Sequence, residues 1–147
     1  MDKLDIKLVR KGAQVPSRAT DGSAGYDLRA CIDEPVTIKA HSRALIPSGV
    51  AIALGGSGYV AVVCARSGLA IKRGISLSNG VGIIDSDYRG EICVGLVNLS
   101  DEDYTIEPGE RIAQLLIMPV FTPKLCVCDE LDESERGAGG FGSTGKK

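Results

Sequence analysis

Apolar residues in this chain fall in short runs, and glycine, proline, serine, aspartate and asparagine separate one run from the next. Many short runs with frequent turn residues are typical of an all-β sandwich or barrel. Helical periodicity is weak, so the pattern predicts strands at 4–10, 26–32, 36–40, 43–54, 59–65, 91–99, 111–120 and 125–131. One or two helical turns are expected over 67–74, where Gly74 supplies a stop signal.

The stretch 80–98, GVGIIDSDYRGEICVGLVN, has apolar residues up to Ile84, a polar centre and a second apolar run. This pattern predicts a β-hairpin. Its loop would bring together Asp85, Asp87, Tyr88 and Arg89. One interpretation is a surface hairpin with an Asp–Arg turn that satisfies itself. The other is a site, because a carboxylate beside a turn with glycines can hold a water and the edge of a base.

The composition becomes acidic and then glycine-rich beyond residue 130. We therefore expect one domain over 1–131 and a flexible C-terminal arm over 132–147, because glycine loses the most backbone entropy on ordering. The arm also carries a guanidinium, an aromatic ring and two hydroxyls, on Arg136, Phe141, Ser143 and Thr144. That set suits closing over an anion attached to a flat group.

Charge and hydropathy restrict the function classes. The 147 residues suffice for a real core, and a net charge of −2 does not favour bulk attraction to nucleic acid. We expect no membrane span and no secretory signal, because the longest apolar run is broken by Gln114 and Pro119 and the N-terminal stretch is charged. His41 is the only histidine, which argues against a histidine-based triad or a histidine zinc site.

The five cysteines are odd in number and scattered, without a C-x-x-C pair. They predict an intracellular, reducing compartment, cytoplasm or nucleus, in which thiols serve as small core residues. Cys126 and Cys128 would share one face of the predicted strand at 125–131. Buried structural thiols and a metal-binding pair are both open for these two.

Three further segments carry candidate chemistry. Arg66 and Ser67 follow a predicted strand at a possible helix start, where free backbone N–H groups favour a phosphate; a simple N-cap at Ser67 is the alternative. Alternation places Gln114 among apolar groups, so it needs a hydrogen-bond partner, in the site or on a neighbouring strand. Asp27 lies on a predicted strand after a turn of small residues, and by itself it indicates no particular function.

Five segments resemble, in order and spacing, the five motifs of trimeric dUTP pyrophosphatases (dUTPases). They are AGYDLRA (24–30), ARSGLA (65–70), GIIDSDYRGEI (82–92), GERIAQLLI (109–117) and RGAGGFGSTG (136–145). The resemblance implies a jelly-roll-like β-barrel or sandwich subunit of a homotrimer, with active sites shared between subunits. It also implies dUTP diphosphatase activity with Mg²⁺ as cofactor, in which dUTP and water give dUMP and pyrophosphate. Ala65 departs from the pattern, because related motifs often carry proline there.

The resemblance assigns roles around the triphosphate. Asp85 would orient the attacking water and accept its proton, and Gln114 would help to hold that water for attack on the α-phosphorus. The phosphates would be bound by Arg66, Ser67 and Gly68, and Arg111 is a further substrate-binding residue. Asp27 would hold magnesium through water, since Mg²⁺ dehydrates reluctantly.

The resemblance also assigns the nucleoside and the arm. Backbone groups at Gly82, Ile84 and Ile92 would pair with uracil, and the Tyr88 ring would lie against deoxyribose. In the arm, Arg136 would clamp the terminal phosphate, Phe141 would stack on uracil, and Gly142, Ser143 and Thr144 would bind substrate. Two alternatives remain: a nucleotide-gated binding or signalling protein of the same fold, and a dCTP deaminase of a related fold.

Overall fold

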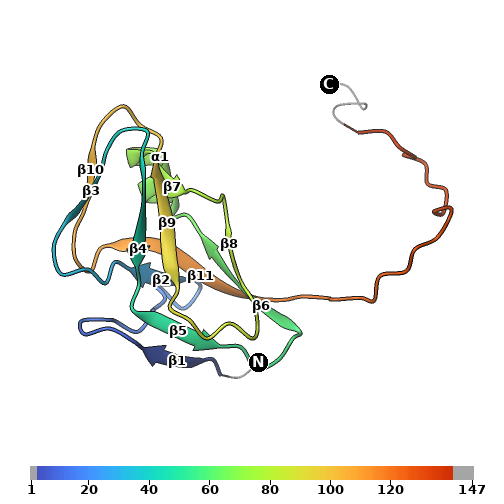
Figure 1. The fold of residues 1–147 in the computed structure, drawn as a ribbon, viewed down its shortest axis with the longest axis horizontal. Helices are drawn as coiled ribbons and strands as arrows, with labels where there is room; N and C mark the ends of the chain where they lie inside the picture. Colours follow the sequence, from blue (N-terminus) through green and yellow to red (C-terminus); the bar gives the residue numbers. More distant parts are fainter. Residues whose placement is uncertain (1–2, 141–147) are drawn as a thin grey trace.

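The computed structural model describes residues 3–140, and strands dominate it (Figure 1). The strands are β1 (Asp5–Leu8), β2 (Tyr26–Arg29), β3 (Val36–Ile38), β4 (Arg43–Pro47), β5 (Val50–Ala53), β6 (Tyr59–Cys64), β7 (Ile75–Leu77), β8 (Gly82–Ile84), β9 (Cys93–Asn98), β10 (Tyr104–Ile106) and β11 (Arg111–Pro119). One short helix, α1 (Ser67–Arg73), lies between β6 and β7. The all-β fold class predicted from the sequence is confirmed.

The strands pair only antiparallel within the described residues and form four small sheets. The largest has the order β2-β11-β6-β8, and a second has the order β4-β9-β7. Two-stranded ribbons, β1-β5 and β10-β3, complete the barrel. Strands that are neighbours in space are mostly distant in sequence, as in a jelly roll (Figure 1).

The core lies between these sheets and is almost entirely aliphatic. Leu28 of β2, Leu115 of β11 and Leu96 of β9 are completely buried, and Ile106 of β10 joins them. On β11 a register shift between Arg111 and Ala113 puts Ile112 and Ala113 both inside. The core thus clamps β2 and β11 together, and these two strands carry Asp27 and Gln114.

Helix α1 follows the expectation for 67–74. Gly74 ends it in the left-handed region, at φ 69°, where the N–H of Gly74 bonds the carbonyl of Ala70. Lys72 and Arg73 lie in the last turn, where positive charge is favourable. The N-cap is Arg66 and no side chain caps it, so the alternative of Ser67 as N-cap is wrong.

Three details of the strand prediction are corrected. The run 43–54 is divided into β4 and β5 by a turn at Gly49, whose φ of 71° suits glycine. Strands β7 and β10, of only three residues each, lack a readable alternation and were not predicted. Residues 125–131 form no strand, because a strand needs a partner for its backbone and the segment after β11 runs away from the barrel (Figure 1).

The predicted hairpin over 80–98 is also wrong as a paired unit. Strand β8 pairs with β6, whereas β9 pairs with β4 and β7 in another sheet. The polar loop between them therefore bridges two sheets instead of closing one ladder. Its turn is real, since the Tyr88 N–H donates to the Asp85 carbonyl at 3.2 Å.

The cysteines do not serve as core residues. Cys31 and Cys64 are half-buried, and Cys93, Cys126 and Cys128 are exposed; all five are free. The expectation that Cys126 and Cys128 are buried is wrong, because residues 125–131 form no strand and both side chains are exposed. No group of three or more His, Cys, Asp or Glu side chains that could hold a metal ion occurs in the described part of the chain.

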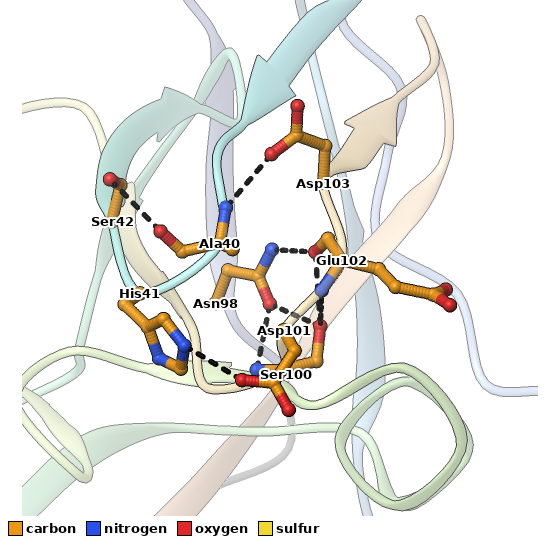
Figure 2. Close-up of polar contacts among 8 residues, drawn as sticks. All are labelled: Ala40, His41, Ser42, Asn98, Ser100, Asp101, Glu102 and Asp103. Atoms are coloured by element: carbon orange, nitrogen blue, oxygen red, sulfur yellow. Dashed lines mark hydrogen bonds and ion pairs between the residues drawn. The ribbon is translucent and has the colours of Figure 1, made fainter.

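A buried amide joins two loops beside the barrel (Figure 2). Asn98 is fully buried, donates to the carbonyls of Ile38 and Glu102, and accepts from the N–H and hydroxyl of Ser100. Nearby, His41 Nε2 lies 2.9 Å from Asp101 Oδ1 on the surface. The single histidine therefore takes part in a loop contact, outside both pockets described below.

Candidate active site

A first pocket, of about 280 Å³, opens where β2, β11 and the start of α1 meet. Register brings its parts together, because Gln114 on β11 pairs with Asp27 on β2 and with Cys64 at the end of β6. The lining residues are Ala19, Ser23, Ala24, Gly25, Asp27, Arg66, Ser67, Gly68 and Gln114. Most of the predicted phosphate-binding residues therefore share one pocket; we call it the phosphate pocket.

Two guanidiniums hold Asp27 in this pocket. Arg66 Nε lies 2.9 Å from Asp27 Oδ1, and Arg111 Nη1 lies 3.1 Å from Oδ2. Arg66 also donates to the backbone carbonyl of Arg111 at 3.1 Å. The Asp27 side chain is only 13% exposed. Arg66 lines the pocket, and Arg111 is linked to it through Asp27. The triad orients both guanidiniums, and each keeps further N–H donors for an anion.

Gln114 is fixed by its neighbours on both sides. Its Nε2 donates at 3.0 Å to the carbonyl of Ala65, the residue directly after β6. This is an internal hydrogen bond of the kind that the sequence left open. At Gly25 a Cβ would lie 2.8 Å from Gln114 Oε1, so the small residue leaves room for that oxygen. At Gly68 a Cβ would meet open space, which leaves the pocket free for a ligand.

A second pocket, of about 370 Å³, lies at the loop between β8 and β9. Its lining residues are Leu45, Ile83, Ile84, Asp85, Tyr88, Glu91, Ile92 and Cys93. Strand β8 is the outer strand of its sheet among the described residues, so one backbone edge lies unpaired in that sheet. Gly82 packs closely on β6, where a Cβ would lie 3.1 Å from that of Val63. We call this the loop pocket.

The Tyr88 ring has a defined place in the loop pocket. Its hydroxyl donates to the Glu91 carbonyl at 3.0 Å, and a Cβ at Gly90 would overlap the ring. Arg89 Nη1 donates to the carbonyls of Ser86 and Tyr88, both at 2.8 Å. The arginine thus closes the turn, as the surface-hairpin interpretation expected, but Asp85 is not its partner in these bonds.

Ile92 lies in the loop pocket with its backbone already engaged. Its N–H donates to the Val50 carbonyl at 2.8 Å, and its carbonyl accepts from the N–H and the hydroxyl of Ser48. In this arrangement Ile92 contributes a buried aliphatic wall rather than free backbone groups. The predicted backbone contact from Ile92 to a base is not favoured by these bonds.

Sequence reasoning missed Glu91 and Arg10. Arg10 Nε lies 2.6 Å from Glu91 Oε1, and the Gly49 N–H donates to the same oxygen at 2.8 Å. The Arg10 hydrogen bond holds the pKa of the Glu91 carboxyl below its usual range, against burial, which raises it. Burial, with the charge of Glu91, raises the pKa of the Cys93 thiol. The only feature of the sequence that could have indicated this ion pair was an acidic residue, Glu91, directly after Gly90 in the loop.

The two pockets share no lining residue. Asp85 therefore lies in one pocket and Gln114, Arg66 and Ser67 in the other. Arg136 lies in neither; its Nε donates to the Gly139 carbonyl at 2.8 Å within the arm. The predicted residues Phe141, Gly142, Ser143 and Thr144 lie outside the described residues.

Comparison with known proteins shows the family of this chain. The dUTPase family model matches residues 11–145, which hold all five motifs. The deoxyuridine 5'-triphosphate nucleotidohydrolase of Paraburkholderia xenovorans is 51% identical over 98% of this chain and 99% of that protein. The chain belongs to the dUTPase family. The enzyme of the same name from Herminiimonas arsenicoxydans is 50% identical over 99% of both chains.

Solved dUTPase structures share the fold. A mutant dUTPase of Staphylococcus bacteriophage 80alpha with dUpNHpp has a TM-score of 0.90 and 32% identity, covering 99% of both chains. A mutant dUTPase from phage phi11 of S. aureus, described with a structural Mg(II) ion, has a TM-score of 0.81 and 25% identity, covering 90% of this chain and 100% of that one. The jelly-roll-like barrel of the dUTPase family is therefore the fold of this chain.

Proposed function

We propose that the protein is a dUTP diphosphatase, which hydrolyses dUTP to dUMP and pyrophosphate by attack of water on the α-phosphorus. The observation that carries the proposal is the grouping of the family motifs into two complementary pockets. One pocket presents the Arg66 guanidinium and the Ser67 hydroxyl for phosphates, and the other presents Asp85 and an aromatic wall. In the cell this reaction keeps uracil out of DNA and supplies dUMP for thymidylate synthesis.

The phosphate pocket binds the triphosphate in this proposal. Arg66 and Arg111 are already oriented by Asp27 and offer charge-assisted N–H donors. Ser67 donates its hydroxyl, and Gly68 lets the backbone approach the phosphate oxygens. Phosphoryl transfer depends mainly on positioning and charge neutralisation, which these groups supply.

The donor set of the phosphate pocket fits Mg²⁺ as cofactor. This ion keeps several waters and is usually bound by one or two carboxylates together with substrate phosphates. Asp27 is the one carboxylate lining that pocket, so it would hold the ion through water while the triphosphate supplies further oxygens. The ion would neutralise charge on the triphosphate.

The loop pocket provides recognition and the base. Asp85 orients the attacking water and accepts its proton as the bond to phosphorus forms, and Gln114 helps to hold the water. Backbone groups on β8 at Gly82 and Ile84 pair with uracil along the open strand edge. A site built on such hydrogen bonds rejects cytosine, where a donor and an acceptor are exchanged. The Tyr88 ring lies against deoxyribose and excludes a ribose hydroxyl.

A homotrimer completes the site. Because the two pockets of one chain share no residue, we propose that the loop pocket of one subunit faces the phosphate pocket of another. The arm of a further subunit, 132–147, then closes over the nucleotide. Arg136 clamps the terminal phosphate, Phe141 stacks on uracil, and Gly142, Ser143 and Thr144 bind substrate. Closure would exclude water and fix the triphosphate for in-line attack.

Location and partners follow the same reasoning. Five free cysteines fit a reducing compartment, cytoplasm or nucleus, where disulfides are rare. The only helix in residues 3–140 has seven residues and cannot span a membrane. The net charge of −2 gives no reason to include nucleic acid among the partners. Neither alternative is favoured: the curated relatives are named as nucleotidohydrolases, and the matching family model is not that of a deaminase.

Pyrophosphate release from each of the four common deoxynucleotides, dUTP and UTP tests the proposal. We expect rapid release from dUTP only, in the presence of Mg²⁺. Replacing the proposed base, Asp85→Asn, should lower turnover by about 10²–10⁴-fold, the usual contribution of general acid–base catalysis. Unchanged turnover in that variant, or equal hydrolysis of dCTP, would remove the assigned roles.

A further inference from the structure

We propose that Glu91 is a positioning residue for nucleotide discrimination, acting through Tyr88. Its carboxylate, held by Arg10 and the Gly49 amide, fixes the loop 85–91 so that the Tyr88 ring stands as a wall of the loop pocket. The inference rests on the proposed role of Tyr88 against the sugar. It adds two residues, Glu91 and Arg10, that the motif roles above leave without a part.

The first step is the attachment of Glu91 to another part of the chain. Arg10, which follows β1, lies 2.6 Å from Oε1, and the Gly49 N–H in the turn between β4 and β5 lies 2.8 Å from the same oxygen. The Glu91 side chain is only 17% exposed, so solvent competes little for these bonds. Charge-assisted bonds of this kind are about twice as strong as neutral ones.

The second step is the link from Glu91 to Tyr88. The backbone carbonyl of Glu91 accepts the Tyr88 hydroxyl at 3.0 Å, so the carboxylate and the ring are anchored through one residue. Gly90 lies beneath the ring, where any Cβ would overlap the hydroxyl and ring carbons. Because residue 91 is fixed to the turn at Gly49, its carbonyl and the ring bonded to it are fixed as well.

The third step compares this anchor with the rest of the loop. Ile92 is bound by its backbone to Val50 and Ser48, which secures the start of β9. Within the loop, Arg89 bonds Ser86 and Tyr88, and the Tyr88 N–H bonds Asp85, all inside the same segment. The Glu91 carboxylate extends this attachment by one residue, from Ile92 into the loop, to the residue whose carbonyl accepts the Tyr88 hydroxyl.

The experiment measures the ratio of kcat/KM for dUTP to that for UTP in Glu91→Gln and Arg10→Gln. The glutamine at 91 keeps the length of the side chain but not its charge. We expect the ratio to fall at least about tenfold in both variants, a typical effect of one misplaced pocket group. The double variant should fall little further, because the two residues act as one unit. Arg10→Lys should restore part of the ratio.

Asp103→Asn is the matched control. Asp103 also accepts a backbone N–H, that of Ala40 at 3.0 Å (Figure 2), and a charged donor, Lys39 Nζ at 2.7 Å. It lines neither the phosphate pocket nor the loop pocket. The Asp103→Asn substitution should leave the ratio of kcat/KM for dUTP to that for UTP unchanged. Amide hydrogen exchange supplies a readout without substrate: exchange over 85–91 should increase in Glu91→Gln and stay as in the wild type in Asp103→Asn.

Tyr88→Ala separates the inference from the role on which it rests. If Tyr88→Ala lowers the ratio while Glu91→Gln and Arg10→Gln do not, the positioning role is refuted and the Tyr88 role stands. If Tyr88→Ala leaves the dUTP/UTP ratio of kcat/KM unchanged, both the Tyr88 role and the positioning role of Glu91 are refuted. Unchanged exchange over 85–91 in Glu91→Gln also overturns the inference. Arg10 is about half exposed, so its variant remains informative if Glu91→Gln does not fold.

Discussion

Asp27 and its two arginines define the chemistry at the scale of single residues. The Asp27 carboxylate contacts Arg66 and Arg111 without using all their N–H donors. It therefore keeps two positive charges together, one of them in the phosphate pocket. Without Asp27 the two guanidiniums would repel each other and lose their orientation. The same logic applies to Glu91, which fixes Arg10 and a loop together.

Glu91 makes stability depend on pH in a predictable direction. Its pKa is lowered from an ordinary value of 4.5, chiefly by the Arg10 hydrogen bond. A depressed pKa contributes stability that is present above the unfolded value and is lost as pH falls through the folded value. The melting temperature of the wild type should therefore exceed that of Glu91→Gln at pH 7, and the gap should narrow below about pH 4.5.

Arg10→Gln provides the internal check on that pH dependence. Arg10 is the main cause of the lowered pKa, so an ionised Glu91 should add little stability to Arg10→Gln. The melting temperatures of Arg10→Gln and of the Arg10→Gln/Glu91→Gln double variant should therefore differ little at every pH. Melting curves at one fixed protein concentration supply the data. A difference in melting temperature between wild type and Glu91→Gln that stays constant from pH 7 to about pH 3 would contradict the account.

At the scale of elements, the sequence predicted what local chemistry dictates. Helix α1 and its stop at Gly74 were readable because an αL cap favours one residue type. Strands β6, β9 and β11 were readable from their apolar runs. The partnership of β8 with β6, and not with β9, was not readable, because strand pairing is decided by distant segments.

The candidate site divides in the same way. The motif residues Asp27, Arg66, Ser67 and Gln114 were predicted, and the structure places them in one pocket. Arg10 was missed because it lies far from Glu91 in sequence, and nothing local marks an ion pair across that separation. Alternation predicted only that Cys126 and Cys128 share a face, and their burial was expected from the usual role of free thiols as core residues. Neither argument supplies a partner strand, and both cysteines are exposed.

Gly74 sets the end of α1 and offers an element-scale prediction. Its φ is 69°, and a Cβ there would lie 3.0 Å from both the Cβ and the backbone nitrogen of Ser100. Gly74→Ala should lower the unfolding free energy by about 1–3 kcal/mol, the usual cost of a non-glycine residue in the left-handed region. Urea unfolding at fixed protein concentration measures it.

Gly68→Ala is the matched control for Gly74. Gly68 lies inside α1 without a positive φ, and a Cβ there meets open space. Alanine at 68 should therefore raise stability, by up to about 1 kcal/mol, through helix propensity. A Gly74→Ala variant as stable as Gly68→Ala would show that the cap geometry does not matter.

For the whole molecule, we propose that the arm acts on a site of another subunit. Residues 120–140 lead away from the barrel of their own chain (Figure 1). Deleting 136–147 should lower kcat for dUTP by about 10²-fold or more, because positioning the reactants contributes much of such rate enhancements. Size-exclusion chromatography should still give a trimer. Normal turnover by the truncated protein would refute closure by the arm.

The central claim is that the loop pocket of one subunit and the phosphate pocket of another form one active site. Mixing two inactive variants, Asp85→Asn and Arg66→Gln, during trimer assembly tests it most directly. A site is intact when its loop pocket comes from an Arg66→Gln subunit and its phosphate pocket from an Asp85→Asn subunit. Each condition is met half of the time in random trimers, so about a quarter of wild-type activity should return. Mixing Asp85→Asn with a chain that carries both Asp85→Asn and Arg66→Gln should recover none, because every loop pocket then lacks the Asp85 carboxylate. Failure of the first mixture to recover activity while trimers form would contradict the account.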